Sequence, residues 1–270
     1  MRFVEKNGIE VLKFPELEKF SEIEHCITTR IGGVSKGPYA SLNMGLTYIE
    51  DQKKDSIENF DRVARTFFDK TAKDYVRTDQ VHDNKIRIIR EEDRGKGLLR
   101  ERDYNGIDGL ITDAKGIILA TGYADCTPLL IYDPIKKVIG SIHSGWKGTL
   151  KGIGKEAIET MVNEFNCKLE DILVGIGPTI GPESFEVELD VYSQFENRYD
   201  DIERILYKRA GKKYYLNLWE ANRIVLEEAG IDSNNIFIDD HCTFTNEDKF
   251  FSHRRDRGKT GRMAALIMLK

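Results

Sequence analysis

Apolar and polar positions alternate with two different periods along the chain. Segments with the one period and segments with the other are interspersed over the whole sequence. A period of two, or a short apolar run bounded by turn residues, predicts a strand, whereas a spacing of three and four predicts a helix. These patterns predict helices at 51–69, 149–166, 185–200 and 217–229, and strands at 25–30, 85–91, 109–113, 116–125, 129–134, 136–143, 171–178, 235–242 and 264–270.

Several of the predicted strands follow one another with no helix between them. Asp133-Pro134 is typical of a tight turn, so 129–134 and 136–143 are expected to form a hairpin. This order favours an α+β fold with a mixed β-sheet core and flanking helices over a doubly wound parallel sheet. No internal repeat or low-complexity linker interrupts the sequence, so we expect residues 1–270 to form a single domain.

The composition, 40% hydrophobic and 32% charged with a net charge of −5, is that of an ordinary globular protein. Its basic residues are scattered rather than clustered, so we expect no nucleic-acid partner. The longest apolar run, 116–124, is too short for a membrane span, and residues 1–14 lack the apolar core of a signal peptide. With four widely separated cysteines, expected to be reduced, these features predict a cytoplasmic protein without a membrane partner.

Three side chains that suit a metal ion occupy polar turns beside predicted strands. They are His82 in TDQVHDN, Cys126 in GYADCTPLL and His143 in GSIHSGWKGT. A thiolate with two imidazoles suits zinc, and three protein ligands leave the fourth position open, as in catalytic sites. Their spacing alone is a weak signal, since Cys126 could equally be a small core residue and His82 a surface residue. A Cys126–His143 pair of nucleophile and base is a further alternative.

Two common nucleotide-binding motifs are excluded. GSIHSGWKGT approaches a phosphate-binding loop, but Trp146 stands where that motif requires lysine. No G-x-G-x-x-G sequence joins a predicted strand to a predicted helix, so a dinucleotide fold has no support. The glycines around Trp146 still allow close approach of the backbone to a ligand, on which the indole could stack unless it is a buried wedge.

A series of segments in chain order, reaching from about residue 25 to the C-terminus, resembles the YfiH/LACC1 family, also called DUF152 or the multicopper polyphenol oxidase family. The resemblance implies a CNF1/YfiH-type fold and the metal ligands His82, Cys126 and His143. Three positions depart from the family pattern: HSGWKG replaces HAGWRG, Asp83 replaces a glycine, and His253 replaces an aromatic residue. The segments are TTRIGGVS (28–35), SLNMG (41–45), DQVH (79–82), ADCTPLLIYDP (124–134), HSGWKGT (143–149), GPTIGPESFEV (177–187), HCT (241–243) and FFSHRRDRGKTGRMAALI (250–267).

Activities associated with this family are phosphorolysis of adenosine, inosine and S-methyl-5′-thioadenosine, adenosine deamination, phenol oxidation, and amidase-type editing of peptidoglycan precursors. A multicopper oxidase needs more imidazoles than the five histidines present here, although adventitious copper could oxidise phenols. We therefore predict a purine nucleoside phosphorylase with adenosine deaminase activity and one Zn²⁺ per chain. The alternatives are a Cys126-dependent amidase and a laccase-like polyphenol oxidase that uses Cu²⁺.

The predicted reaction needs cations for phosphate and groups that move protons or orient ligands. Asp108 and Asp125 could carry protons, orient the histidines or cap turns, and each cation could equally be a solvated surface residue. The expected partners are purine nucleosides and phosphate, and the chain is expected to be a monomer or a weak homodimer. We predict catalytic roles for Cys126, Asp125, Arg30 and Lys147, and substrate-binding roles for Asn43, Asp108, Trp146, Arg254 and Arg255.

Overall fold

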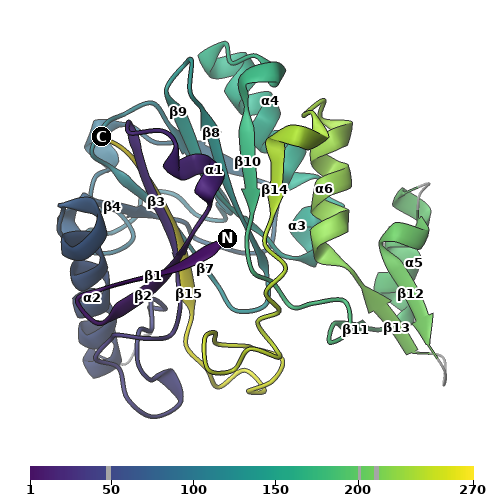
Figure 1. Ribbon diagram of the computed structural model, residues 1–270, viewed down its shortest axis with the longest axis horizontal. Helices are drawn as coiled ribbons and strands as arrows, with labels where there is room; N and C mark the ends of the chain where they lie inside the picture. The colour runs from purple at the N-terminus through teal and green to yellow at the C-terminus, as the bar shows by residue number, and fades with distance from the viewer. Residues whose placement is uncertain (47–49, 200–201, 210–212) are drawn as a thin grey trace.

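The structure, a computed structural model, describes residues 1–46, 50–199, 202–209 and 213–270. Two six-stranded sheets stack face to face, with helices on their outer faces (Figure 1). The fold is α+β, as predicted. The first sheet has the order β1 (Arg2–Lys6), β2 (Ile9–Lys13), β3 (Ile23–Thr28), β15 (Met263–Leu269), β7 (Ile118–Tyr123), β4 (Tyr75–Arg77), and the second β14 (Ile236–Ile238), β10 (Leu173–Ile176), β8 (Thr127–Asp133), β9 (Val138–Ser144), β6 (Gly109–Thr112), β5 (Ile86–Ile88).

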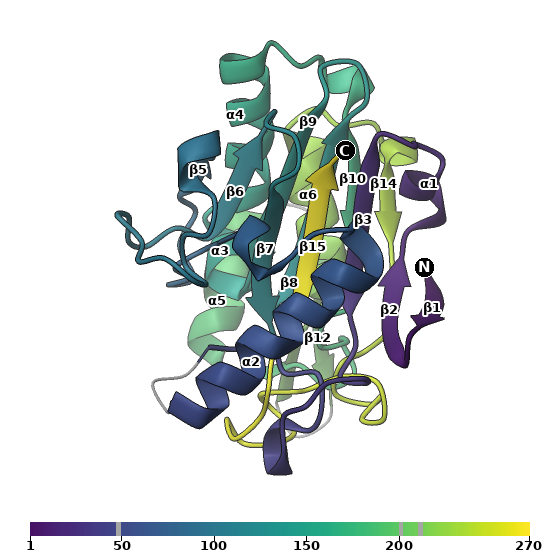
Figure 2. The same ribbon diagram turned by 90° about the vertical axis from the view of Figure 1, so that its left-hand side faces the viewer.

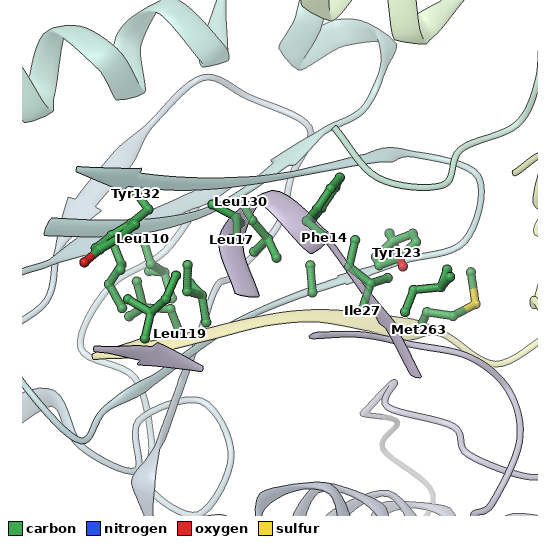
Figure 3. Packing of buried hydrophobic residues seen from close by; sticks show 14 of the residues in the cluster. Phe14, Leu17, Ile27, Leu110, Leu119, Tyr123, Leu130, Tyr132 and Met263 are labelled. Carbon is green, nitrogen blue, oxygen red and sulfur yellow. The ribbon is translucent and has the colours of Figure 1, made fainter. Parts of the chain in front are cut away.

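The main core fills the space between the two sheets. Leu119 of β7 and Leu130 of β8 contribute to it from opposite sides, and Phe14 packs among them (Figure 3). Neighbouring residues on the same strands, such as Ile118 and Leu129, are buried on the outer faces beneath helices. Because both faces of these strands are buried, their sequences are apolar runs rather than strict alternations.

Helices cover the outer face of each sheet. α2 (Glu50–Val63) lies across the first sheet (Figure 2) and buries Phe60 and Val63 against it. α4 (Ile153–Phe165) and α6 (Leu218–Glu228) pack on the second sheet. The remaining elements are α1 (Pro15–Glu18), α3 (Trp146–Leu150) and, projecting to one side in Figure 1, a small sheet of β11 (Glu186–Val187), β13 (Lys213–Leu216) and β12 (Leu206–Arg209) with α5 (Leu189–Arg198).

Several predicted elements are confirmed, including α2, α6 and the β8–β9 hairpin. The single helix predicted at 149–166 is wrong, because α3 already begins at Trp146 and Gly152, with a φ of 76°, separates it from α4. The helix predicted at 185–200 begins only at Leu189, after β11, and its last residue lies outside the described residues. Among the described residues, no helix is both long and apolar enough to cross a membrane.

The prediction also omitted the hairpin of β1 and β2 and the short strands β4, β12 and β13. Asn7-Gly8 joins β1 to β2, and both residues have a positive φ. This dipeptide is among the strongest hairpin signals, so the sequence did contain the information.

The topology brings one end of each sheet together. β4 and β7 are parallel; β4 ends at Arg77, opposite Ala120, and β7 continues in the same direction to Tyr123. The chain then crosses from β7 to β8 in the second sheet, where Pro128 pairs with His143 near the end of β9. The loop after β4, the β7–β8 link and the end of β9 therefore meet at one place.

Candidate metal centre

The three predicted metal ligands converge where these segments meet. His82 lies in the loop after β4, Cys126 in the β7–β8 link and His143 on β9, and their ligand atoms all lie within 4.8 Å of one another. Sγ of Cys126 is 3.7 Å from Nε2 of His82, and the two imidazole rings meet edge to face. One soft and two borderline donors, converging at the wall of an open cavity, fit a tetrahedral ion such as Zn²⁺ with one position free.

Asp108, just before β6, fixes both histidines. Its carboxylate accepts hydrogen bonds from Nδ1 of His143 at 2.8 Å and from the backbone N–H groups of Val81, His82 and Asp83 at 3.0 to 3.1 Å. The bond to Nδ1 leaves Nε2 of His143 available for a metal, an arrangement typical of carboxylate–histidine–zinc sites. Asp108 is fully buried and does not line the cavity, so its contacts support an orienting role rather than substrate binding.

Two residues of the centre have left-handed backbone conformations. The φ angles are 63° for His82 and 82° for Asp125, the residue before Cys126. Such conformations are strained for residues other than glycine and need support from their surroundings. His82 receives it from Asp108, while the carbonyl of Asp125 accepts hydrogen bonds from Ile180 and Thr179.

The carboxylate of Asp125 also contacts the C-terminal part of the chain. One oxygen accepts a hydrogen bond from the Thr243 hydroxyl at 2.6 Å, and the other from the backbone N–H of Arg254 at 2.7 Å. Both bonds hold the link that carries Cys126. These contacts support the orienting alternative for Asp125 rather than proton transfer.

Gly145 packs so closely against the centre that no side chain would fit at this position. A Cβ atom at this position would lie 2.8 Å from Cδ2 of His82 and 3.0 Å from Sγ of Cys126. Contacts this short cannot form without moving a ligand. Close approach of the backbone, rather than turn geometry, therefore requires glycine after Ser144.

Cys126 and His143 shift each other's protonation. Burial raises the pKa of Cys126, but the charge of His143 and the hydrogen bonds of both histidines outweigh it and lower the pKa to about 6. Burial likewise lowers the pKa of His143, whereas the Cys126 thiolate and Asp108 raise it to about 9. The thiolate needed for metal binding is thus the favoured form at neutral pH.

The cluster opens into a cavity of about 1100 Å³. Two groups of lining side chains differ in polarity. The apolar end is the group that packs with the small sheet and α6, namely Trp146, Ile180, Phe185 and Leu218, with the Arg254 guanidinium over the Phe185 ring. The cationic end is the group of Lys53, Arg77, Arg100, Arg102 and Arg262.

Not all predicted site residues line this cavity. Cys126, Asp125, Trp146 and Arg254 do, whereas Asn43, Asp108, Arg30, Lys147 and Arg255 do not. The guanidinium of Arg30 donates to the carbonyls of Ala40 and Glu247. Arg255 is bonded to Asp256 and three carbonyls, and Lys147 is exposed near the Trp146 ring. The structure lends no support to phosphate binding by these three cations.

The remaining histidines do not extend the cluster. Nε2 of His25 accepts a hydrogen bond from Phe14 inside the core, and His241 is paired with Asp239. His253 lines the cavity but does not belong to the group of ligand atoms around Cys126. Within the described part of the chain, two histidines are therefore available to one metal centre.

Comparison with known proteins adds to this picture. A family described as multi-copper polyphenol oxidoreductase laccase matches residues 24–270. The chain is 37% identical over 247 residues to a Bacillus subtilis protein named purine nucleoside phosphorylase YlmD, which covers 90% of this chain and 87% of that one. Crystal structures of Bacillus licheniformis hypothetical protein YfiH and of YlmD from Geobacillus stearothermophilus superpose with TM-scores of 0.90 and 0.89, at 34% and 35% identity, over 99% of this chain and 99% and 98% of theirs.

Proposed function

Because the chain belongs to the family described as multi-copper polyphenol oxidoreductase laccase, in which a relative is named purine nucleoside phosphorylase, we propose that it cleaves purine nucleosides with phosphate. The substrates are adenosine, inosine and S-methyl-5′-thioadenosine. The products are the free base and ribose 1-phosphate or, from the last substrate, the 5-methylthioribose 1-phosphate. Adenosine deamination is a second activity of the same site. The observation that carries the proposal is that the His82–Cys126–His143 cluster lines the same cavity as a group of apolar side chains and a group of cations.

Each part of the cavity suits one part of the reactants. Trp146 and Phe185 offer aromatic faces to a purine, and Ile180 and Leu218 exclude water around it. The cationic end suits phosphate. His82, Cys126 and His143 would hold one Zn²⁺, which supplies a fixed positive charge and Lewis acidity when it is bound. Asp108 and Asp125 keep these ligands in place.

The proposal is tested by incubating the purified protein with adenosine and separating the products by chromatography. With phosphate present we expect adenine and ribose 1-phosphate, inosine as the product of deamination, and hypoxanthine from phosphorolysis of that inosine. Omitting phosphate should abolish adenine, hypoxanthine and ribose 1-phosphate, while inosine still forms. Failure to release base from any of the three nucleosides, in protein with its metal complement confirmed, would contradict the proposal.

The geometry also supports one alternative from another reaction class. Asp108, His143 and Cys126 lie in the order of an orienting acid, a base and a thiol nucleophile. A Cys126-dependent amidase acting on peptidoglycan precursors would use this arrangement without a metal. In that case iodoacetamide should label Cys126 rapidly in the untreated protein, whereas a metal-bound thiolate should react only after a chelator is added.

A laccase-like copper enzyme is less well supported. A mononuclear site together with a trinuclear cluster needs more imidazoles than His82 and His143 can supply. We propose zinc as the resident metal, at about one ion per chain, and metal analysis of protein purified without added metal tests this. Copper in several-fold excess over zinc would favour the oxidase.

A further inference from the structure

Two half-buried arginines of the cavity, Arg77 and Arg262, have no acidic partner among the described residues; Arg100 and Arg254 form no ion pair either, but they are exposed to solvent. Neither Arg77 nor Arg262 forms an ion pair with a carboxylate among the residues that the structure describes. Arg102, in the same cavity, is instead neutralised by Asp79 at 2.7 Å. A buried or half-buried charge without a counter-ion costs free energy. Two such arginines in one cavity therefore indicate a site for an anion.

Arg77 is the last residue of β4. Its guanidinium stacks over Phe60 and donates one hydrogen bond, of 3.3 Å, to the carbonyl of Gly97. An arginine has five N–H donors, so most of those of Arg77 remain open to the cavity that it lines. Burial, together with the charge of Arg102, lowers its pKa to about 10, which still leaves it charged at neutral pH.

Arg262 precedes β15. Its backbone N–H donates to Oδ1 of Asn43, which also accepts from Gly45, and its Nη1 donates to two carbonyls of its own turn. Its Nη2 has only a long contact of 3.5 Å with His253. Burial lowers its pKa, while the nearby charges of Cys126 and Asp125 oppose that effect. Arg262 therefore lies within electrostatic range of the metal centre.

The register of the first sheet places both arginines on one face. Arg77 is paired with Ala120, and Met263 with Tyr123, so Arg262 falls opposite Ala124. Gly122 lies midway between these two positions on β7, and the Gln80 side-chain amide is hydrogen-bonded to its backbone N–H and carbonyl. A Cβ on Gly122 would lie 3.7 Å from Oε1 of Gln80 and 3.8 Å from Nη2 of Arg77, so the glycine keeps this space between the arginines free of a further side chain.

We propose that Arg77 and Arg262 bind the phosphate co-substrate over Gly122, beside the His82–Cys126–His143 cluster. Guanidinium groups hold phosphate through paired, charge-assisted hydrogen bonds, and two of them would neutralise a dianion. The apolar end of the cavity takes the purine. The ribose then lies between base and phosphate, as displacement at its C1′ requires.

This inference rests on the proposed phosphorolysis, in which every bond change is accounted for. One oxygen of hydrogen phosphate forms a bond to C1′ of the ribose as the bond from C1′ to N9 of the base breaks. The electron pair of the broken bond goes to the purine, which takes up the proton that hydrogen phosphate releases. Arg77 and Arg262 keep the phosphate next to C1′ and balance its remaining charge.

The test compares Arg77→Gln and Arg262→Gln with wild type and with Arg62→Gln as the matched control. Arg62 is an exposed arginine of α2 that is paired with Glu58 and does not line the cavity. We expect each of the first two variants to raise the KM for phosphate about 10- to 100-fold, with the KM for adenosine within about twofold. Arg62→Gln should keep both values, and Arg262→Lys should recover part of the loss because it restores charge without the planar fork.

Zinc content and melting temperature, measured on every variant, identify loss of fold, and calorimetry with inorganic phosphate measures the site directly. The inference is supported if wild type binds phosphate and both glutamine variants do not. This holds even if no nucleoside is cleaved, and in that case only the proposed function fails. Wild-type phosphate KM and affinity in both folded variants overturn the inference. The inference is also overturned if both variants keep the wild-type KM for phosphate but adenosine 5′-monophosphate no longer competes with adenosine. The arginines would then bind a nucleotide phosphate instead.

Discussion

The metal centre and the arginine pair share one cavity, yet their polar groups have opposite surroundings. Around the metal ligands, the carboxylates of Asp108 and Asp125 have donors on both oxygens. The guanidinium groups of Arg77 and Arg262 have no carboxylate within reach among the described residues. Satisfied groups rigidify a site, whereas groups with open donors are available to a ligand. We therefore expect Asp108 and Asp125 to hold the centre together, and Arg77 and Arg262 to contact the substrate.

The largest effect is expected at Cys126, because its thiolate is needed both to hold the metal and for activity. Cys126→Ser removes the thiolate ligand, so zinc content should fall from about one per chain to near zero and nucleoside cleavage should cease. Metal analysis and the chromatographic assay measure both. Cys242→Ser is the control, because Cys242 is a half-buried thiol outside the cluster that accepts a hydrogen bond from Gly181. A folded, inactive Cys126→Ser protein that keeps its metal would show that the thiol acts as a nucleophile rather than as a metal ligand.

A smaller effect is expected at Asp108, which acts only through the ligands. Asp108→Asn cannot satisfy three backbone donors and a histidine with one carbonyl oxygen, so zinc affinity should fall about 10- to 100-fold. Competition with a chromophoric chelator measures the affinity. Asp113→Asn, at an exposed carboxylate paired with Arg90, should leave it unchanged. Equal zinc affinity in Asp108→Asn and wild type would show that the hydrogen bonds to Asp108 do not position the ligands.

The smallest of the three effects concerns Gly145. Gly145→Ala should displace His82 or Cys126 by a few tenths of an ångström or more and weaken zinc binding several-fold, because its Cβ would contact both. Gly140→Ala on β9, the strand that ends just before Gly145, is the control, since its Cβ would have no neighbour closer than 3.5 Å. The same chelator titration distinguishes them. Unchanged affinity in Gly145→Ala would mean that the centre tolerates movement and is less rigid than its hydrogen bonds imply.

Much of the fold could be predicted because its signals are local. The spacing of apolar residues in α2 and α6, and the Asp133-Pro134 turn between β8 and β9, depend on neighbouring residues only. The break between α3 and α4 was missed because a glycine inside a helical pattern is a weak signal. The strand β4 is three residues long, too short to show a period.

Part of the candidate site, likewise, could be predicted from the sequence, and part could be identified only from the structure. His82, Cys126 and His143 could be nominated because their side chains suit a metal and their segments resemble a family. The cations could not be chosen in this way. Arg30 and Arg255 look as available in the sequence as Arg77 and Arg262, and only the folded chain shows whose donors are already used. The importance of Gly145 likewise depends on atoms from two distant segments.

The bonds of Asp125 to Thr243 and Arg254 have a consequence for how the protein is made. They span 118 and 129 residues, and contacts across such separations pay a large loop-closure entropy and form slowly. A nascent chain that ends before residue 243 already contains all three metal ligands, but the link that carries Cys126 lacks its support. We therefore expect the centre to reach its complete geometry only after residues 243 and 254 have been synthesised.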